Sequence, residues 1–463
     1  MHTLVLSDIH LGNGAGYDIF AGGDLLPATL VAAAAAGTNV VFNGDTFDFL
    51  MNEDPLELDI ARATAQAEAI ARNPPTAATL AALGKVLAAG GQVEIRLGNH
   101  DVELALPEVQ AVFRRALAQP DAIAERLVFT LGDAPGLLEV GGAKILVTHG
   151  EQNDKWNQIV YDHLDAAHAA HFSYPPGSRL VKTLLNPLKR RFGMRFADLL
   201  KPDFQGGVLT TLAVDPSALG LVFQGSTLKL LWQLFRRMDD DVSFAPGAAT
   251  PAEPELGLAV ALDAADLSPE ERAALEAALD PDAVSFGLLG DARELLGAAS
   301  AKVARAGLRL YAQAQRHLAG GIGDSFFDLA PDPDEWKEAQ RLGTKFRADA
   351  VVLGHTHAAR FRSDPDLTYV NTGTWIYLMR LPAADAPLAD WQDFIDQCRA
   401  NPGLDPARGP CPALISRPTG LAIDPDPAGG ARLQLLEFTA AGPRVLGEAR
   451  VRAHAPSGSE AMS

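Results

Sequence analysis

Six short apolar runs along this chain end abruptly in polar, glycine-containing clusters. The runs are Thr3–Leu6, Val40–Phe42, Val93–Leu97, Lys144–Val147, Ala348–Leu353 and Thr368–Val370, and they precede SDIHLG, NGDTFD, GNHD, THGE, GHTH and NTGTW. Short apolar runs without clean alternation are typical of strands that are buried on both faces. Alanine-rich helical stretches separate the early runs: Leu26–Ala36, Leu56–Arg72, Ala77–Ala89 and Pro107–Leu117. Strands that alternate with helices predict an α/β fold, with ligand sites at the carboxyl ends of the strands.

Residues 154–333 interrupt this alternation. The segment contains a predicted helix at Ile159–His171, an apolar and basic stretch at Ser226–Met238, and a further predicted helix at Asp291–Ala319. Ser178–Lys201 carries seven Lys and Arg residues against one acid, Asp198. We expect a mostly helical insertion here, between core segments 1–153 and 334–452. The second core segment opens with a helix at Asp334–Phe346 and closes with two strands in Ala431–Arg452, before a loose tail at 453–463.

The composition narrows the class of protein. The 463 residues include 39 Lys and Arg against 58 Asp and Glu, a net charge of −19, which argues against a general nucleic-acid coat. Cys398 and Cys411 are too few for a disulfide framework or a cysteine-rich zinc site. No run reaches the roughly 18 apolar residues of a membrane helix, and MHTLVLSD lacks the basic start of a signal peptide. We expect a cytoplasmic protein.

Side chains that can hold a metal ion gather at the predicted strand ends. The candidate ligands are Asp8, His10, Asp45, Asn99, His149, His355 and His357. They offer imidazole nitrogens and carboxylate or amide oxygens without sulfur, a donor set that suits Mn, Fe, Zn or similar ions. In DIH and HTH the paired residues are two apart, so in extended backbone both side chains leave on the same face.

The ordered series SDIHLG, NGDTFD, GNHD, THG and GHTH resembles the calcineurin-like metallophosphoesterase family. The resemblance covers residues 1–153 and 335–380. It implies a four-layer α/β/β/α sandwich that carries a binuclear metal centre. It also implies one metal held by Asp8, His10, Asp45 and His357, and a second held by Asp45, Asn99, His149 and His355, with Asp45 bridging. Manganese is the ion we expect, with Fe, Zn, Ni or Mg as alternatives.

The resemblance also implies a hydrolytic mechanism. A hydroxide that bridges the metals would attack phosphorus, and His100 would bind a phosphate oxygen and protonate the leaving group. Asp101 or Asp48 would hold the imidazole of His100 in one tautomer. Each aspartate is equally well explained as a turn-capping residue.

Other polar residues near the motifs carry two interpretations. Glu151, Asp154 and Asn157 follow His149, and they either line the substrate mouth or are structural. Asn371 belongs to a turn beside the site or contacts substrate. His163, His168 and His171 are better explained as a helix surface than as ligands.

Three substrate classes remain open. The first is a soluble phosphodiester or phosphomonoester, with the diester favoured by His100. In the second, residues 178–238 form a lid for a lipid-linked pyrophosphate and contact anionic lipid; SDIHLG, GDTFDF and GHTH are distantly similar to the bacterial UDP-2,3-diacylglucosamine pyrophosphohydrolases, although that subgroup carries an arginine at the position of His100. In the third, Ser178–Lys201 binds nucleic acid and the enzyme is a nuclease. A metal-free scaffold is the non-enzymatic alternative.

Overall fold

The structure is a computed structural model, and it describes residues 2–131, 136–164, 172–199, 325–382, 386–404 and 414–452, with short pieces between 210 and 302. The chain divides into two compact units. Unit 1 comprises Met1–Arg179, Phe327–Tyr377 and Ser416–Ser463, and unit 2 comprises Leu180–Phe326 and Leu378–Ile415. The strand-end motifs all belong to unit 1.

The larger sheet of unit 1 has the strand order β14-β13-β12-β1-β2-β3-β4. Strands β1 to β4 run parallel to one another, and β12 joins β1 in the antiparallel direction. The bounds are β1 Thr3–Leu6, β2 Asn39–Asn43, β3 Val93–Arg96, β4 Leu127–Thr130, β12 Thr419–Pro425, β13 Ala431–Glu437 and β14 Arg444–Val451. The parallel half therefore directs the carboxyl ends of β1, β2 and β3 to one edge of the sheet.

The smaller sheet has the strand order β5-β6-β7-β9-β8, in which β6, β7 and β9 are parallel. Its strands are β5 Gly136–Val140, β6 Ala143–Val147, β7 Ala350–Leu353, β8 Ala359–Ser363 and β9 Thr368–Thr372. One buried hydrophobic cluster takes Val5 and Val41 from the larger sheet and Ile145 and Val352 from the smaller. The two sheets therefore share a core. A separate two-stranded sheet pairs β10 Tyr377–Met379 with β11 Leu414–Ser416.

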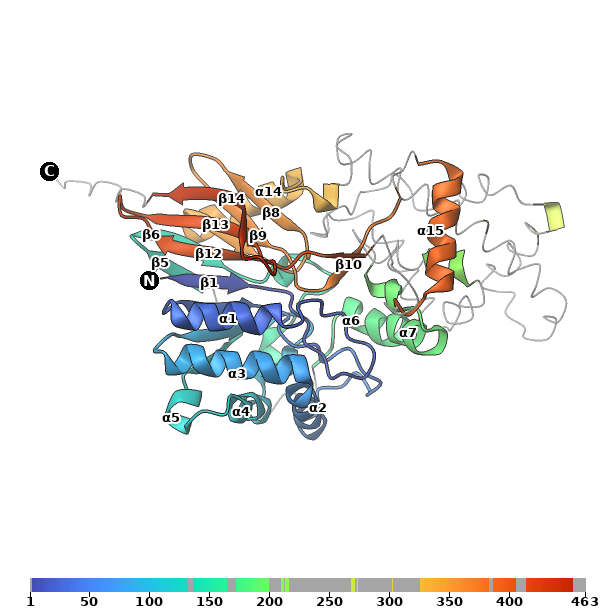
Figure 1. Cartoon of the computed structure of the whole chain (residues 1–463), viewed down its shortest axis with the longest axis horizontal. Coiled ribbons are helices and arrows are strands. Elements are labelled where there is room, and N and C mark those ends of the chain that lie inside the picture. Colours follow the sequence, from blue (N-terminus) through green and yellow to red (C-terminus); the bar gives the residue numbers. More distant parts are fainter. Residues whose placement is uncertain are drawn as a thin grey trace. The chain divides into compact units, whose positions relative to one another are not determined.

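Helices connect the parallel strands of unit 1 (Figure 1). Their bounds are α1 Leu25–Ala35, α2 Ile60–Arg72, α3 Pro74–Ala88, α4 Pro107–Ala116, α5 Asp121–Ala124 and α14 Pro333–Phe346. Helix α1 packs against α3 and α2 against α4, while α14 contacts β7. A capping box of Asp332 and Glu335 begins α14, and the same Glu335 carboxylate pairs with Arg360 of β8 at 2.9 Å. The helix is thereby fixed to the smaller sheet.

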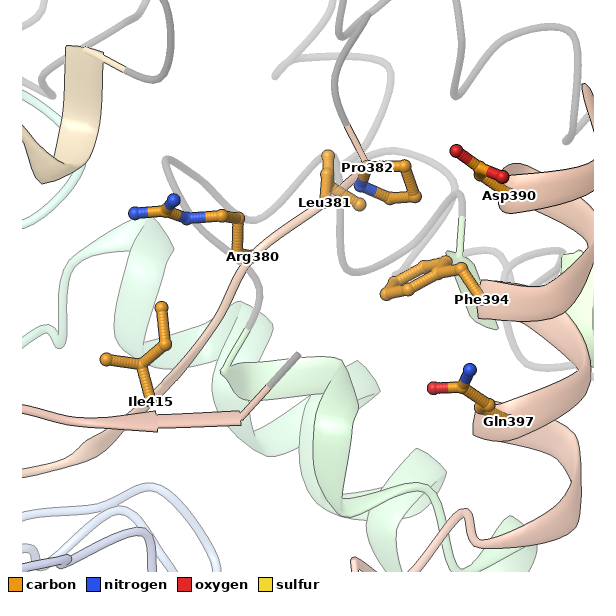
Figure 2. Close-up of a pocket in the computed structure, with 7 residues that line it drawn as sticks. All are labelled: Arg380, Leu381, Pro382, Asp390, Phe394, Gln397 and Ile415. Atoms are coloured by element: carbon orange, nitrogen blue, oxygen red, sulfur yellow. The ribbon is translucent and has the colours of Figure 1, made fainter. Parts of the chain in front are cut away.

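The described part of unit 2 contains helices and most of the β10–β11 sheet. It contains the last residue of α6 (Pro176–Leu180), a π-helical turn at Val181–Leu185, α7 Asn186–Phe192 and α15 Leu388–Ala400. The buried Lys189 of α7 pairs with Asp198 at 2.5 Å. This unit contains a pocket of about 400 Å³. Seven residues line it (Figure 2): Arg380, Leu381, Pro382, Asp390, Phe394, Gln397 and Ile415.

The α/β class predicted from the sequence is confirmed, with mixed parallel and antiparallel sheets. The helix predicted at Ile159–His171 is wrong over its described part, because residues 159–164 form a single 3-10 turn at Tyr161–His163. His168, His171, Ser226–Met238, almost all of Asp291–Ala319 and the tail at 453–463 lie outside the described residues. Among the helices that are described, none is long and apolar enough to cross a membrane.

Candidate metal centre

Five loops, each following a strand, bring the candidate ligands together in unit 1. Asp8 and His10 follow β1, Asp45 follows β2, Asn99 follows β3, His149 follows β6, and His355 and His357 follow β7. Asp8, His10, Asp45, Asn99 and His149 are buried, whereas His355 and His357 are partly exposed. All seven ligands predicted from the sequence therefore lie at strand ends of the two sheets that share the core.

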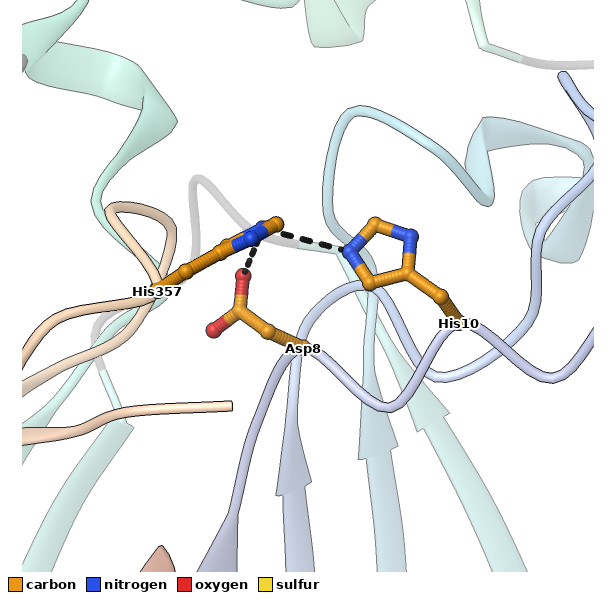
Figure 3. Close-up of side chains that lie close together, drawn as sticks. All are labelled: Asp8, His10 and His357. Atoms are coloured by element: carbon orange, nitrogen blue, oxygen red, sulfur yellow. Dashed lines mark hydrogen bonds and ion pairs between the residues drawn. The ribbon is translucent and has the colours of Figure 1, made fainter. Parts of the chain in front are cut away.

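Asp8, His10 and His357 form one cluster (Figure 3). His357 Nε2 lies 3.3 Å from Asp8 Oδ1 and 3.3 Å from His10 Nε2, so that three donor atoms converge on one point. The other carboxylate oxygen of Asp8 accepts a hydrogen bond from the backbone N–H of His355 at 3.0 Å. The loop after β7 is thereby fastened to the loop after β1.

Asp45, His149 and His355 form a second cluster, in which the possible ligand atoms lie within 4.8 Å of one another. Asp45 Oδ2 lies 3.4 Å from His149 Nε2 and 3.8 Å from His10 Nε2. The carboxylate of Asp45 is therefore close to donors of both clusters. Its second oxygen, Oδ1, accepts the backbone N–H of His100 at 2.9 Å, which fixes the orientation of the carboxylate.

Hydrogen bonds to the outer ring nitrogens decide which imidazole atom faces each cluster. His149 Nδ1 lies 2.7 Å from the carbonyl oxygen of Asn43, an acceptor, so Nδ1 carries the proton. His10 Nδ1 lies 3.0 Å from the carboxylate of Asp48 and donates in the same way. In the neutral imidazole the lone pair is then on Nε2, which is the atom that a metal ion needs.

The donor chemistry of both clusters fits divalent cations. The side-chain oxygen Oδ1 of Asn99 is buried and accepts no hydrogen bond within the described part of the chain. Buried polar atoms of this kind are rare in folded proteins and call for a partner such as an ion. A lone pair on His149 Nε2 that faces the Asp45 carboxylate likewise requires a proton or a cation between them. The residues present could therefore hold metal ions.

The backbone of the site is strained in one characteristic way. Asp8, His10, Asp45, His355 and His357 have φ between 50° and 68°, in the left-handed region that non-glycine residues seldom adopt. They make up five of the eight such non-glycine residues in the described part of the chain. Strain of this kind concentrates at functional sites, where the surrounding structure holds it in place.

Glycines allow the loops to approach each other closely. A Cβ on Gly44, whose φ is +86°, would lie 2.3 Å from the ring of His149. A Cβ on Gly98 would lie 2.2 Å from Asp45 Oδ1 and 2.6 Å from the Asp45 backbone nitrogen. Neither position can accept a side chain without displacing a candidate ligand.

The electrostatics of the cluster keep its carboxylates ionised. Burial by itself would raise the pKa of Asp8, but the nearby His357 outweighs it and lowers the pKa to about 2. Burial also opposes ionisation of Asp45, yet His149 and His100 hold its pKa well below the usual value. Burial lowers the pKa of His149, but the charge of Asp45 overrides it and the pKa is raised well above its usual value. Buried anions of this density need positive charge beside them.

His100 lies at the edge of the first cluster, with 15% of its side chain exposed. Its Nδ1 is 3.3 Å from Asp48 Oδ1, and its ring lies edge-on to His10 with centroids 4.6 Å apart. Asp48 is thus the predicted aspartate that lies beside His100, and its pKa is held far below the usual value, against burial, by His100 and His10.

Asp101 has a different set of contacts. Its carboxylate accepts the backbone N–H groups of Gly98 at 2.6 Å, Thr46 at 2.8 Å and Phe47 at 3.3 Å. These bonds hold the loops after β2 and β3 together, as the turn-capping interpretation proposed. Burial, followed by the charge of Asp45, raises the pKa of Asp101 to about 8.

Three supporting residues were given no definite role from the sequence. The carboxylate of Asp154 lies 3.0 Å from His355 Nε2, and the amide of Asn371 donates to Gly354 O at 2.8 Å and Thr356 Oγ1 at 3.0 Å. Asn371 is fully buried and holds the GHTH loop through these two hydrogen bonds. Glu151 is also buried, with its carboxylate bonded to the hydroxyl of Tyr161. Glu151 and Asp154 follow β6, as their place after an apolar run indicated, whereas Asn371 lies within β9 and the turn predicted there is wrong.

Comparison with known proteins adds no relative. No family model matches the chain, and no curated protein matches it in sequence.

Proposed function

We propose that this protein is a two-metal phosphoester hydrolase of the calcineurin-like metallophosphoesterase type, acting on phosphodiesters. The observation that carries the proposal is the position of Asp45, whose carboxylate lies within 3.4 Å of His149 Nε2 and 3.8 Å of His10 Nε2. A carboxylate shared by two nitrogen-rich clusters is the arrangement that a pair of neighbouring cations requires. One cation would be held by Asp8, His10, Asp45 and His357, and the other by Asp45, Asn99, His149 and His355.

The protein supplies orientation and proton transfer. Bound divalent cations contribute Lewis acidity, which neutralises phosphoryl oxygens and makes water more acidic. His100, at the partly exposed edge of the cluster, is placed to bind a phosphate oxygen and to protonate the leaving alkoxide. Because its Nδ1 faces Asp48, Nε2 is the nitrogen that would carry the transferred proton. Asp48, which accepts the Nδ1 proton, would hold the ring in place and stabilise the imidazolium that protonates the leaving group.

The finer architecture belongs to the same proposal. Two sheets with a shared core, with helices that connect their parallel strands, are consistent with a four-layer α/β/β/α sandwich. The long segment between His149 and His355 would be a mostly helical insertion that restricts which substrates reach the centre.

The experiment is hydrolysis of bis(p-nitrophenyl) phosphate and p-nitrophenyl phosphate with and without Mn²⁺, with Asp45→Asn as the matched variant. We expect Mn²⁺-dependent turnover of the diester that exceeds turnover of the monoester and is lost in Asp45→Asn. Monoester preference would make the protein a phosphatase. Metal-independent turnover, or turnover that survives in Asp45→Asn, would overturn the proposal.

A lipid-linked pyrophosphate is the second candidate substrate. The observation in its favour is the basic surface of α7, where Arg190 and Arg191 are exposed. This candidate predicts binding to vesicles that contain anionic phosphatidylglycerol and an increase of turnover in detergent. Efficient hydrolysis of soluble diesters without vesicle binding would exclude it in favour of the first.

A further inference from the structure

Two side chains that follow His149 connect two candidate ligands of the same metal. Asp154 Oδ2 lies 3.0 Å from His355 Nε2 and accepts the amide N–H of Asn157 at 2.7 Å. The Asn157 oxygen Oδ1 in turn accepts from Asn99 Nδ2 at 3.4 Å. A chain of hydrogen bonds thus runs from His355 through Asp154 and Asn157 to Asn99.

The direction of every bond in this chain follows from Asp154. Asp154 Oδ1 accepts the backbone N–H of Trp156 at 2.9 Å and Oδ2 accepts the Asn157 amide, so both oxygens of this carboxylate act as acceptors. His355 must therefore carry its proton on Nε2, which leaves the lone pair on Nδ1. Asn157 must likewise present its NH₂ group to Asp154, which turns its oxygen towards Asn99.

The orientation of the Asn99 amide follows in the next step. Asn157 Oδ1 is a hydrogen-bond acceptor, so the Asn99 amide must turn its NH₂ group towards it. The Asn99 oxygen Oδ1 is then directed elsewhere. That oxygen is one of the buried side-chain atoms that have no hydrogen-bond partner in the described part of the chain. The relay therefore selects the two atoms, Asn99 Oδ1 and His355 Nδ1, that a cation would bind.

The backbone at the start of α6 secures the middle of the relay. A Cβ on Gly177 would lie 2.1 Å from Asn157 Oδ1, and the Gly177 N–H donates to the Trp156 carbonyl oxygen at 2.9 Å. The absence of a side chain at residue 177 is what lets the Asn157 amide stay in place.

We propose that Asp154 and Asn157 are positioning residues that set the ligand atoms of Asn99 and His355 for the second metal of the centre. This inference rests on the proposed function, because it assumes that Asn99 and His355 bind a metal ion. It assigns Asp154 and Asn157 no contact with substrate. The polar partners of coordinating side chains commonly change metal affinity by 10–100-fold when they are replaced.

The test measures metal binding by the full-length chain rather than activity. Mn²⁺ per chain is determined by elemental analysis and titration calorimetry, and the electron paramagnetic resonance spectrum distinguishes a spin-coupled Mn²⁺ pair from an isolated ion. The variants are Asn157→Leu, which removes the relay, and Gly177→Ala, which pushes on Asn157 Oδ1 without removing a polar group. The control is Asn39→Leu, because Asn39 is a buried asparagine that accepts the backbone N–H of Gln92 at the opposite end of β2.

We expect two Mn²⁺ per chain in wild type and in Asn39→Leu. In Asn157→Leu and Gly177→Ala, the affinity of one site should fall 10–100-fold, and the spectrum should change to that of an isolated ion. Two ions of unchanged affinity in both variants would overturn the positioning role while leaving the proposed function intact. A wild-type chain that binds no Mn²⁺ would overturn both. If Asn157→Leu does not fold, Gly177→Ala alone decides, since alanine is compatible with a helix.

Discussion

Asp48 accepts hydrogen bonds from two histidines with different proposed tasks. Its Oδ2 lies 3.0 Å from Nδ1 of His10, a candidate ligand, and its Oδ1 lies 3.3 Å from Nδ1 of His100, the candidate acid. One carboxylate therefore fixes the tautomer of both rings. A change at this residue should affect metal binding and proton transfer together.

Asp48→Asn tests this dual role. The amide must direct its NH₂ group at one of the two ring N–H groups, so one histidine has to change its tautomer. We expect a loss of 10–100-fold in Mn²⁺-dependent turnover of bis(p-nitrophenyl) phosphate. The control is Asp59→Asn, which exchanges one good N-cap residue of α2 for another and should leave turnover unchanged. Equal turnover in both variants would contradict the role of Asp48.

His100→Asn tests the general acid. Loss of a proton donor should matter most when the leaving group is a poor one, because p-nitrophenolate leaves without protonation. We expect turnover of an alkyl diester to fall by about 10²–10⁴-fold, and turnover of bis(p-nitrophenyl) phosphate to fall far less. Equal losses on the two substrates would show that His100 binds the phosphate without donating a proton.

At this scale the sequence predicted which residues would gather but not how they are supported. All seven candidate ligands follow strands, and strand ends of parallel sheets meet at one edge. The role of Asp154 could not be predicted, because its partner His355 is about two hundred residues away along the chain. Asp101 and Asp48 were indistinguishable in the sequence, since only the loop geometry decides which one lies beside His100.

Among the elements, the turn that follows β2 combines backbone strain with close packing at a candidate ligand. Gly44 has a left-handed backbone, and a Cβ added to it would lie 2.3 Å from the ring of His149. Gly37, which precedes β2, also has a left-handed backbone, with φ +66°, but its missing Cβ has nothing within 4 Å. A comparison of the two glycines therefore distinguishes the effect of a left-handed backbone from the effect of crowding at the Cβ position.

Gly44→Ala and Gly37→Ala should therefore differ in stability. Both replacements place alanine in the left-handed region at a cost of about 1–2 kcal/mol. Gly44→Ala should lose about 1–3 kcal/mol more, because the new methyl group collides with His149. Urea denaturation in the presence of EDTA measures the difference without a contribution from metal. Equal free energies of unfolding in the two variants would show that the His149 loop can move aside without loss of stability.

Prediction from the sequence succeeded for elements that carry a strong local signal. β1 has the predicted bounds, and α1, α3, α4 and α14 differ from prediction by at most three residues at either end. The strands β4, β5, β8, β10, β11 and β12 were missed; β4, β5 and β8 are partly exposed and owe their conformation to pairing with neighbours. The helix predicted at Ile159–His171 failed over its described part because residues 159–164 belong to the loop that follows the His149 motif.

On the scale of the molecule, each proposed metal would be bonded to both sheets of unit 1. Asp8, His10 and Asp45 follow strands of the larger sheet, and His149, His355 and His357 follow strands of the smaller sheet. The α/β class could be predicted because buried strands alternate with helices. A Pro-Pro-Gly break at 175–177 precedes the start of unit 2 at Leu180, whereas nothing in the sequence set Leu378–Ile415 apart from its neighbours.

Removal of metal should therefore lower the stability of both sheets together. Mn²⁺ at one hundred times its dissociation constant should stabilise the protein by about 2.7 kcal/mol per site relative to the EDTA-treated form. Addition of Mn²⁺ should slow backbone hydrogen exchange at the carboxyl ends of β1 and β2 and also at those of β6 and β7. Asp45→Asn should abolish most of the gain. Slower exchange in one sheet alone would contradict a centre that joins the two.

The positions of the ligands along the chain also determine the order in which they appear during translation. Asp8, His10, Asp45 and Asn99 leave the ribosome before His149, and His149 leaves it about two hundred residues before His355 and His357. At roughly 5–20 residues per second, His149 waits about 10–40 s for the two ligands that complete the clusters, and the other four wait longer. During that interval the nascent chain displays an open set of carboxylates and imidazoles. The order of translation thus makes the GHTH loop the last part of the centre to arrive and the step that closes it.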